Sequence, residues 1–394
     1  MEIKITELSN VIFNDLIIGP VEDGKVSIGI NKNNKIIKIP IIGNQIIHLL
    51  RHGNNIKETA LILGNESLNT NDVEVFVKQL CELGFVARVD NIVVNEIESI
   101  ASKIMKANNF GFVKNPITLS LLVFFTLLTF LNLINNFNAI RVDSLFWSGY
   151  TFVSLITYQL ISWIILFLHE YGHVFAAKLV GIESNLRIKI NGPFITVYTV
   201  FELLWSRTRG ERIFTYLGGV IIEILILGIS SIIYSFSNSI LIVTPLKIVI
   251  TVCILGFLSQ IQLLFKTDMY LIIKEIAKKD IYLSFSDFKK TILNRNLKER
   301  IDLITSISII LHTIAFISRF LISLYIISLV YYFSYCEITQ GFQQKYQWHL
   351  LSGLCSVIIQ TILLFPFIKS VVLRVFKDKK KNIGNKRSLY DSVN

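Results

Sequence analysis

Long apolar runs fill the chain from Pro116 onward, and they restrict its fold more than any other feature. Six runs are close to the roughly 20 residues that an α-helix needs to cross a bilayer, and short polar segments separate them. We therefore expect a mainly α fold, a polytopic membrane helix bundle of about six transmembrane helices. The expected spans are Pro116–Ile134, Gly149–Lys178, Ile213–Tyr234, Thr244–Leu264, Ile304–Phe333 and Trp348–Val375.

The composition changes where these runs begin. Residues 1–112 have the mixture of a soluble protein, whereas over the 394 residues of the chain 52% are hydrophobic and only 17% are charged. Soluble proteins have about 45–50% and 25%, respectively. We expect a small N-terminal α/β cytoplasmic domain at 1–95, a connector at 96–115, a transmembrane domain at 116–375 and a basic cytoplasmic tail at 376–394.

The net charge of +11 reflects Lys and Arg that gather in the loops after the second, fourth and sixth spans. Cytoplasmic loops carry such an excess, so we expect a multi-pass protein of the cell membrane with both termini in the cytoplasm. Charges in this position also favour the lipid bilayer over nucleic acid as a partner. The first ten residues are polar and the four cysteines lack C-x-x-C spacing, so we expect no cleavable signal peptide and free thiols.

The second span contains a His-Glu-x-x-His motif, formed by His169, Glu170 and His173. Residues four apart lie on the same face of an α-helix, so the two imidazoles can bind one metal ion. Zn²⁺ accepts neutral imidazole nitrogen, and Glu170 is placed to take a proton from a water molecule at the ion. Such polar groups are costly in a lipid-buried helix unless they bind something. The alternative is an accidental match whose histidines only pack in a core.

A zinc protease needs a third protein ligand, and Asp268 is the best-placed carboxylate in the remaining spans. It falls at the cytoplasmic end of the fourth span, at the depth expected for the two histidines. Thr267 and Asp268 could instead cap a helix at the membrane surface, because both residue types often begin helices. Glu223, in the third span, should face the bundle interior, where it could support a ligand histidine or pair with a cation.

Short strand and helix patterns fill the first 95 residues. Val26–Ile30 and Lys35–Ile39 predict a hairpin. Asn71 is the expected N-cap of the last of three helices, and Gly84 should end that helix. This order predicts a winged-helix-like fold. The helices are expected at Gly43–Leu50, Ile56–Leu63 and Asp72–Leu83, and a closing strand at Phe85–Val89.

A second hairpin is expected after the His-Glu-x-x-His motif. Leu186–Ile190 and Phe194–Val200 are strand-like, and the intervening Asn191-Gly192 is a turn signal. An edge strand beside a metal site could hold an extended substrate through backbone hydrogen bonds. An ordinary surface hairpin is the alternative.

The N-terminal domain resembles the PqqD-like peptide-recognition domain of ribosomal peptide modification systems. Such domains capture the leader segment of a precursor peptide as an added strand at a sheet edge, so the resemblance implies a peptide partner. The alternative is a winged-helix fold used as a scaffold or for other contacts. The matching features are the hairpin, the helix with Ile46-Ile47-His48-Leu49-Leu50, the small helix with Glu58, and Asp72-Val73 running into Leu83-Gly84-Phe85-Val86.

The membrane domain resembles the site-2-protease-like family of intramembrane zinc metalloproteases over about residues 150–275. The matching residues are His169-Glu170-Tyr171-Gly172-His173, Gly181, Gly218-Gly219 and Phe265-Lys266-Thr267-Asp268-Met269-Tyr270. The resemblance implies that His169 and His173 are zinc ligands, that Asp268 is the third ligand, and that Glu170 is the general base.

The chain departs from the family pattern around the expected third ligand. Met269 stands where the family has Gly, and Leu263 stands near the usual Pro. Gln260 or Gln262 replaces an Asn that is expected to help orient the substrate.

These features together predict a membrane-embedded zinc metalloendopeptidase. Its substrate would be a ribosomally made precursor peptide or a membrane-anchored protein, delivered by the N-terminal domain. The alternative is a non-catalytic peptide-binding membrane protein, such as an immunity, export or sensing component, with a structural or vestigial metal site. A transporter with an accidental motif would predict internal repeats of the spans, and the sequence has none that we detect.

Overall fold

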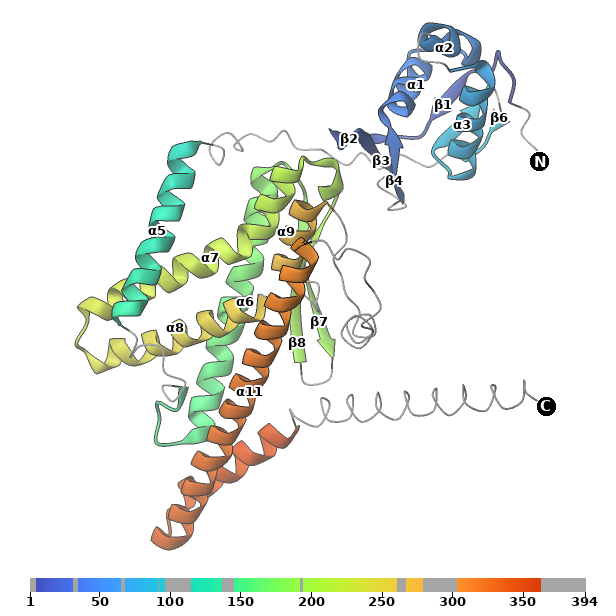
Figure 1. Cartoon of the computed structure of the whole chain (residues 1–394). Helices are drawn as coiled ribbons and strands as arrows, with labels where there is room; N and C mark the ends of the chain where they lie inside the picture. The colour runs from blue at the N-terminus through green and yellow to red at the C-terminus, as the bar shows by residue number, and fades with distance from the viewer. Residues whose placement is uncertain are drawn as a thin grey trace, which may run out of the picture. The chain divides into compact units, whose positions relative to one another are not determined.

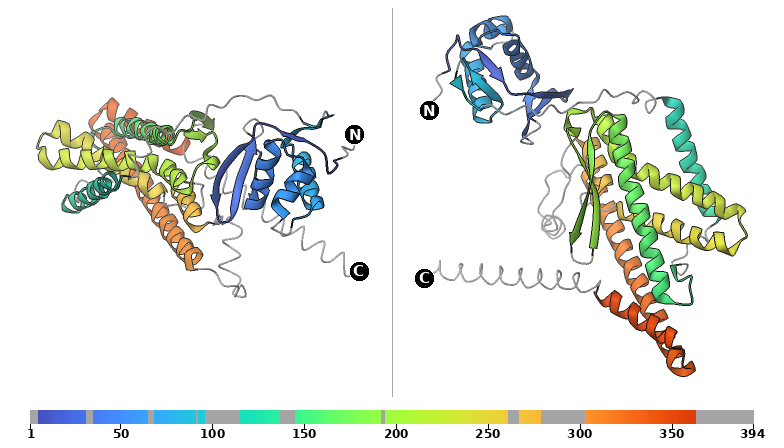
Figure 2. Two further views of the ribbon diagram at one scale, coloured as in Figure 1. Left: turned by 90° about the horizontal axis from the view of Figure 1, so that it is seen from above. Right: turned by 180° about the vertical axis from the view of Figure 1, so that it is seen from behind.

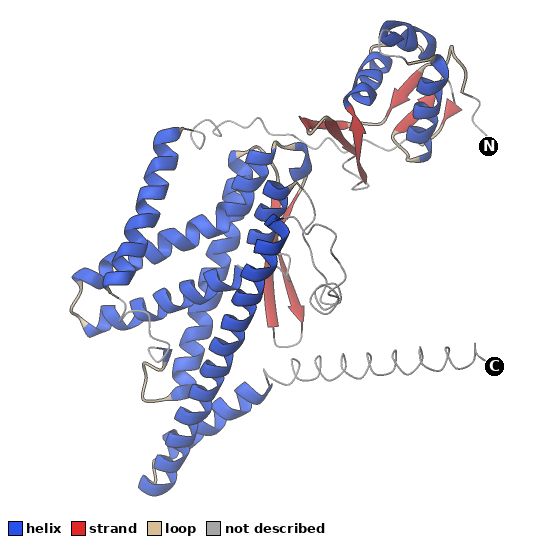
Figure 3. Cartoon of the chain, in the orientation of Figure 1, coloured by secondary structure: helices blue, strands red, loops and turns tan. Residues whose placement is uncertain are grey.

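The computed structural model describes residues 5–30, 35–64, 68–90, 92–95, 115–136, 145–191, 194–260, 267–278 and 303–362. This part of the chain is mainly helical and carries a small N-terminal domain with β-sheet (Figures 1 and 3), which confirms the expected fold class. The chain divides into two compact units. The first combines residues 1–114 with 173–186 and 199–216, and the second contains 115–172, 187–198 and 217–394.

Two three-stranded sheets form in the N-terminal domain. The predicted hairpin is confirmed, since β3 (Lys25–Ile30) and β4 (Lys35–Pro40) pair antiparallel, and β2 (Ile17–Glu22) extends their sheet in the order β2-β3-β4. The other sheet has the order β1-β5-β6. Strands β1, β2 and β6 were not predicted, because β1 and β6 are very short and β2 has an irregular register against β3. The strands of that other sheet are β1 (Val11–Phe13), β5 (Val86–Val89) and β6 (Ile92–Val93).

Three helices pack on these sheets, as predicted. They are α1 (Ile41–Arg51), α2 (Ile56–Leu63) and α3 (Thr70–Glu82), and they share one apolar core with the strands. The prediction that Asn71 is the N-cap of the third helix is wrong. Asn69 caps α3 instead, because its side chain accepts from the Asp72 N–H while the Asp72 carboxylate accepts from the Asn69 N–H. This reciprocal pairing satisfies two N–H groups that the helix leaves without partners.

Five of the described helices are long and apolar enough to cross a membrane. Within the second unit, α7 and α8 form a helical hairpin around residues 237–239 (Figures 1 and 2). The first four spans agree with the prediction to within a few residues. The helices are α5 (Pro116–Asn135), α6 (Thr151–Leu179), α7 (Arg209–Phe236), α8 (Ile240–Gln260) and α11 (Leu303–Gln344).

The structure covers the last two expected spans in different degrees. The fifth expected span, Ile304–Phe333, lies within α11, which continues to Gln344. The candidate membrane span found there among the described residues is Phe320–Gln344. Of the sixth, residues 347–362 are helical and the rest lies outside the described residues. Most of the expected connector at 96–115 and all of the basic tail also lie outside them.

The second predicted hairpin is present. Strands β7 (Ser184–Asn191) and β8 (Phe194–Phe201) pair in a two-stranded sheet that directly follows α6. A short 3-10 helix, η4 (Leu204–Ser206), leads from β8 into α7. The four cysteines are free thiols, as expected.

Candidate metal centre

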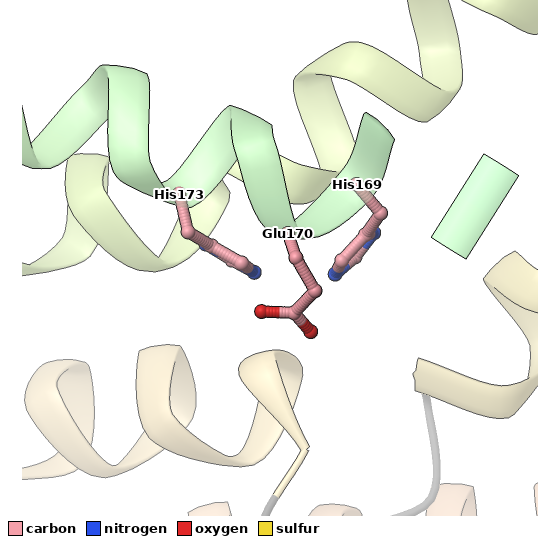
Figure 4. A group of neighbouring side chains, drawn as sticks. All are labelled: His169, Glu170 and His173. Carbon is pink, nitrogen blue, oxygen red and sulfur yellow. The ribbon is translucent and has the colours of Figure 1, made fainter. Parts of the chain in front are cut away.

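The His-Glu-x-x-His motif lies in the last three turns of α6, a continuous helix of 29 residues. Its three polar side chains project from the same side of the helix, and the Glu170 carboxylate lies between the two imidazole rings (Figure 4). The metal-binding atoms of His169, Glu170 and His173 all lie within 4.8 Å of one another. Both histidines are almost fully buried, with 2% and 3% of their surface exposed. The four-residue spacing thus brings both imidazoles together as the helical period requires.

A backbone carbonyl determines which nitrogen of His173 faces the centre. His173 Nδ1 lies 2.9 Å from the carbonyl oxygen of Thr215, a fully buried residue of α7. A carbonyl oxygen only accepts hydrogen bonds, so Nδ1 must carry the proton and donate it. Nε2 then keeps its lone pair, which is the form of imidazole that binds a metal ion.

Asp268 lies against the other histidine. Its Oδ2 is 2.9 Å from His169 Nε2, and its side chain is 19% exposed. Asp268 is the first residue of α9 (Asp268–Ala277), a helix separate from α8, because its N-cap Thr267 has an extended backbone. The described part of α8 ends at Gln260. Thr267 is the N-cap of α9 and accepts from the Tyr270 N–H, so the capping role belongs to Thr267.

Glu223 of α7 contacts the opposite side of His169. Its Oε1 lies 3.0 Å from His169 Nδ1, and only 6% of Glu223 is exposed. The sequence left two roles open for Glu223, support of a ligand histidine or pairing with a cation. The structure places it against a histidine of the motif. His169 lies between two carboxylates, one at each ring nitrogen.

Glycines allow α6 and α7 to approach closely at this point. A Cβ atom at Gly172 of α6 would overlap the backbone carbonyl of Gly218 in α7. A Cβ atom at Gly219 would overlap the imidazole of His169. Small residues permit such close helix contacts in membranes, and here they leave the room that the His169 ring occupies.

The group formed by His169, Glu170 and His173 could hold a metal ion. Two imidazoles and a carboxylate are the ligand types that zinc prefers, and ligand atoms of one tetrahedral zinc stand about 3.3 Å apart at bond lengths of about 2.0–2.1 Å. The 2.9 Å between His169 Nε2 and Asp268 Oδ2 is a hydrogen-bond distance, shorter than that spacing. Gln260 supports the same region, because its Oε1 accepts from the Asp268 N–H at 3.4 Å. Gln262 lies outside the described residues.

Two ion pairs with the N-terminal domain stabilise the start of α7 within the first unit. Glu22 accepts a hydrogen bond from Arg212 at 2.8 Å, and Asp23 accepts one from Arg209 at 2.8 Å. Burial raises the pKa of Glu22, but the hydrogen bond and charge of Arg212, together with Arg209, outweigh burial and bring the pKa below its usual 4.5. Because α7 also supplies Thr215, these ion pairs hold the helix that orients His173.

The structure thus brings Glu170 together with both histidines of the motif, and it places Glu223 and Asp268 against His169. Sequence reasoning missed Thr215, which acts through its backbone carbonyl and so gives no side-chain signal. It named Gly172 only as part of the motif, although a Gly beside a ligand histidine is a usable sign of close helix packing.

Comparisons with protein-family models, with curated proteins and with solved structures find no match to this chain.

Proposed function

We propose that this protein is a membrane-embedded zinc metalloendopeptidase of the site-2-protease-like type. One observation carries the proposal: two buried imidazoles and a carboxylate share one face of a membrane-length helix, with their metal-binding atoms within 4.8 Å of one another. The Asp268 carboxylate at 2.9 Å from His169 supports a third ligand. Buried polar groups in a membrane helix are costly, and a bound ion offsets that cost.

Each side chain has a role in the proposed reaction. His169, His173 and Asp268 would hold the ion. A bound zinc would supply Lewis acidity, which lowers the pKa of its water to about 7 and polarises the scissile carbonyl. Glu170 accepts the proton of the attacking water and returns it to the amine of the departing peptide. The buried setting strengthens these electrostatic effects, because little bulk water screens them.

The proposed substrate is a ribosomally made precursor peptide or a membrane-anchored protein. A PqqD-like role for the N-terminal domain is supported by its β2-β3-β4 sheet, in which β4 is an edge strand whose neighbour among the described strands is β3. An extended leader segment would add to such an edge through backbone hydrogen bonds. The distribution of positive charge supports a cell-membrane location with both termini in the cytoplasm.

A comparison of the peptides in whole cells tests this function and does not require a purified substrate. Cells of a strain without the gene would receive the wild type, Glu170→Gln or His169→Ala, and the purified proteins would be analysed for zinc. We expect new peptide termini only with the wild type, zinc in the wild type and Glu170→Gln, and little zinc in His169→Ala. Identical termini with the wild type and Glu170→Gln would contradict the role of Glu170. Zinc without any cleavage would favour the non-catalytic peptide-binding alternative.

A further inference from the structure

We propose that Glu223 is a positioning residue for the metal site. Its carboxylate contacts Nδ1 of His169, and this contact fixes the orientation of the imidazole ring whose Nε2 would bind the ion. The inference rests on the proposed function, because it assigns a role toward the same zinc ion. It adds a carboxylate, from a different helix, that does not itself need to touch the ion.

The two nitrogens of the His169 ring have different partners. An imidazole has two nitrogens, and His169 presents each of them to a different carboxylate. Nε2 faces Asp268, which belongs to the proposed ligand set, whereas Nδ1 faces Glu223 at 3.0 Å. A proton on Nδ1 is attracted to the Glu223 carboxylate, which leaves the lone pair of Nε2 for the metal ion.

Glu223 is a buried residue that lies beside His169. Its side chain is 8% exposed, and a carboxylate buried at membrane depth is costly without a partner. Among the described residues, His169 is the ion-pair partner that the structure gives it, and Oε2 of Glu223 has no hydrogen-bond partner there. Gly256 of α8 leaves space for this carboxylate, since a Cβ atom at that position would lie 3.3 Å from Oε1. The packing of these helices therefore places the Glu223 carboxylate next to Nδ1 of His169.

The two histidines differ in how they are supported. His173 donates to a neutral backbone carbonyl, that of Thr215, whereas His169 faces a charged carboxylate. A carboxylate behind a ligand histidine raises the basicity of the metal-binding nitrogen and fixes the ring orientation. Removing such a group weakens metal affinity by about 10–100-fold.

Zinc affinity of the full-length protein in detergent tests the role of Glu223. The dissociation constant would be measured by competition with a chromophoric chelator, and the geometry would be followed by the visible spectrum of the Co²⁺-loaded protein. We expect about tenfold weaker zinc binding in Glu223→Gln, since the amide keeps the size of the side chain but lacks its charge, and about 100-fold in Glu223→Ala. Both variants should change the Co²⁺ spectrum.

Glu337 offers a matched control. It is a second buried carboxylate of a membrane helix, 7% exposed, and it accepts from the backbone N–H and the hydroxyl of Thr151 at the start of α6. Glu337→Gln should lower the unfolding temperature but leave the zinc affinity and the Co²⁺ spectrum unchanged.

The outcomes separate this inference from the proposed function. Wild-type affinity in both Glu223 variants, or an equal loss in Glu337→Gln, would overturn the role of Glu223 and leave the metal site standing. A wild-type protein that binds neither zinc nor Co²⁺ would overturn the metal site itself.

Discussion

Gly219 offers the sharpest test of the packing around the metal centre. In Gly219→Ala, the new Cβ atom would lie 2.6 Å from two carbon atoms of the His169 ring, whereas ordinary contact begins at 3.4 Å. The ring must therefore move by roughly 0.8 Å, if the backbone stays in place. Metal–ligand distances tolerate only about 0.2 Å. We expect Gly219→Ala to lose most of its zinc.

The same substitution should leave the protein folded. Overpacking costs about 1–3 kcal/mol, and Ala recovers about 1 kcal/mol over Gly inside a helix. Gly228→Ala is the matched control, because its Cβ would overlap Phe125 and Thr129 in the same unit, away from the histidines. Metal analysis and thermal unfolding of the detergent-purified variants would be measured together. Stoichiometric zinc of wild-type affinity in Gly219→Ala, or equal zinc loss in Gly228→Ala, would refute the reasoning.

Three further predictions concern the third ligand, an ion pair and a helix cap. Asp268→Ala should hold less zinc than the wild type in metal analysis, and unchanged zinc content would remove Asp268 from the ligand set. Because the folded pKa of Glu22 lies below 4.5, its stabilising effect should be complete above about pH 4.5 and be lost as the pH falls through the folded pKa. Unfolding temperatures measured from pH 3 to pH 7 should therefore depend less on pH in Glu22→Gln, and identical profiles would contradict this. Asn69→Ala should destabilise α3 by about 1 kcal/mol, seen as faster hydrogen exchange of its first amides, whereas Asn71→Ala should change little; the reverse order would restore Asn71 as the cap.

Local patterns predicted much of the fold because they report on single elements. The helices at 41–51, 56–63 and 70–82 and both hairpins follow from turn residues and apolar spacing. The N-cap of α3 was misplaced by two residues because Asn69 and Asn71 both precede the helical pattern, and only the pairing with Asp72 distinguishes them. Strand β2 escaped detection, since Gly19-Pro20 interrupts its alternation and the pairing with β3 is irregular there.

The sequence by itself determined that two imidazoles and a carboxylate share one face of a membrane-length helix. This follows from the helical period, which is a property of the backbone and needs no other part of the chain. Only the tertiary structure decided which groups surround those imidazoles. Thr215, Glu223 and Asp268 reach them across 42 to 99 positions of the chain, through the packing of α6 against α7 and the placement of α9. Such contacts depend on how side chains of different helices fit together, and no periodicity within one helix encodes that fit.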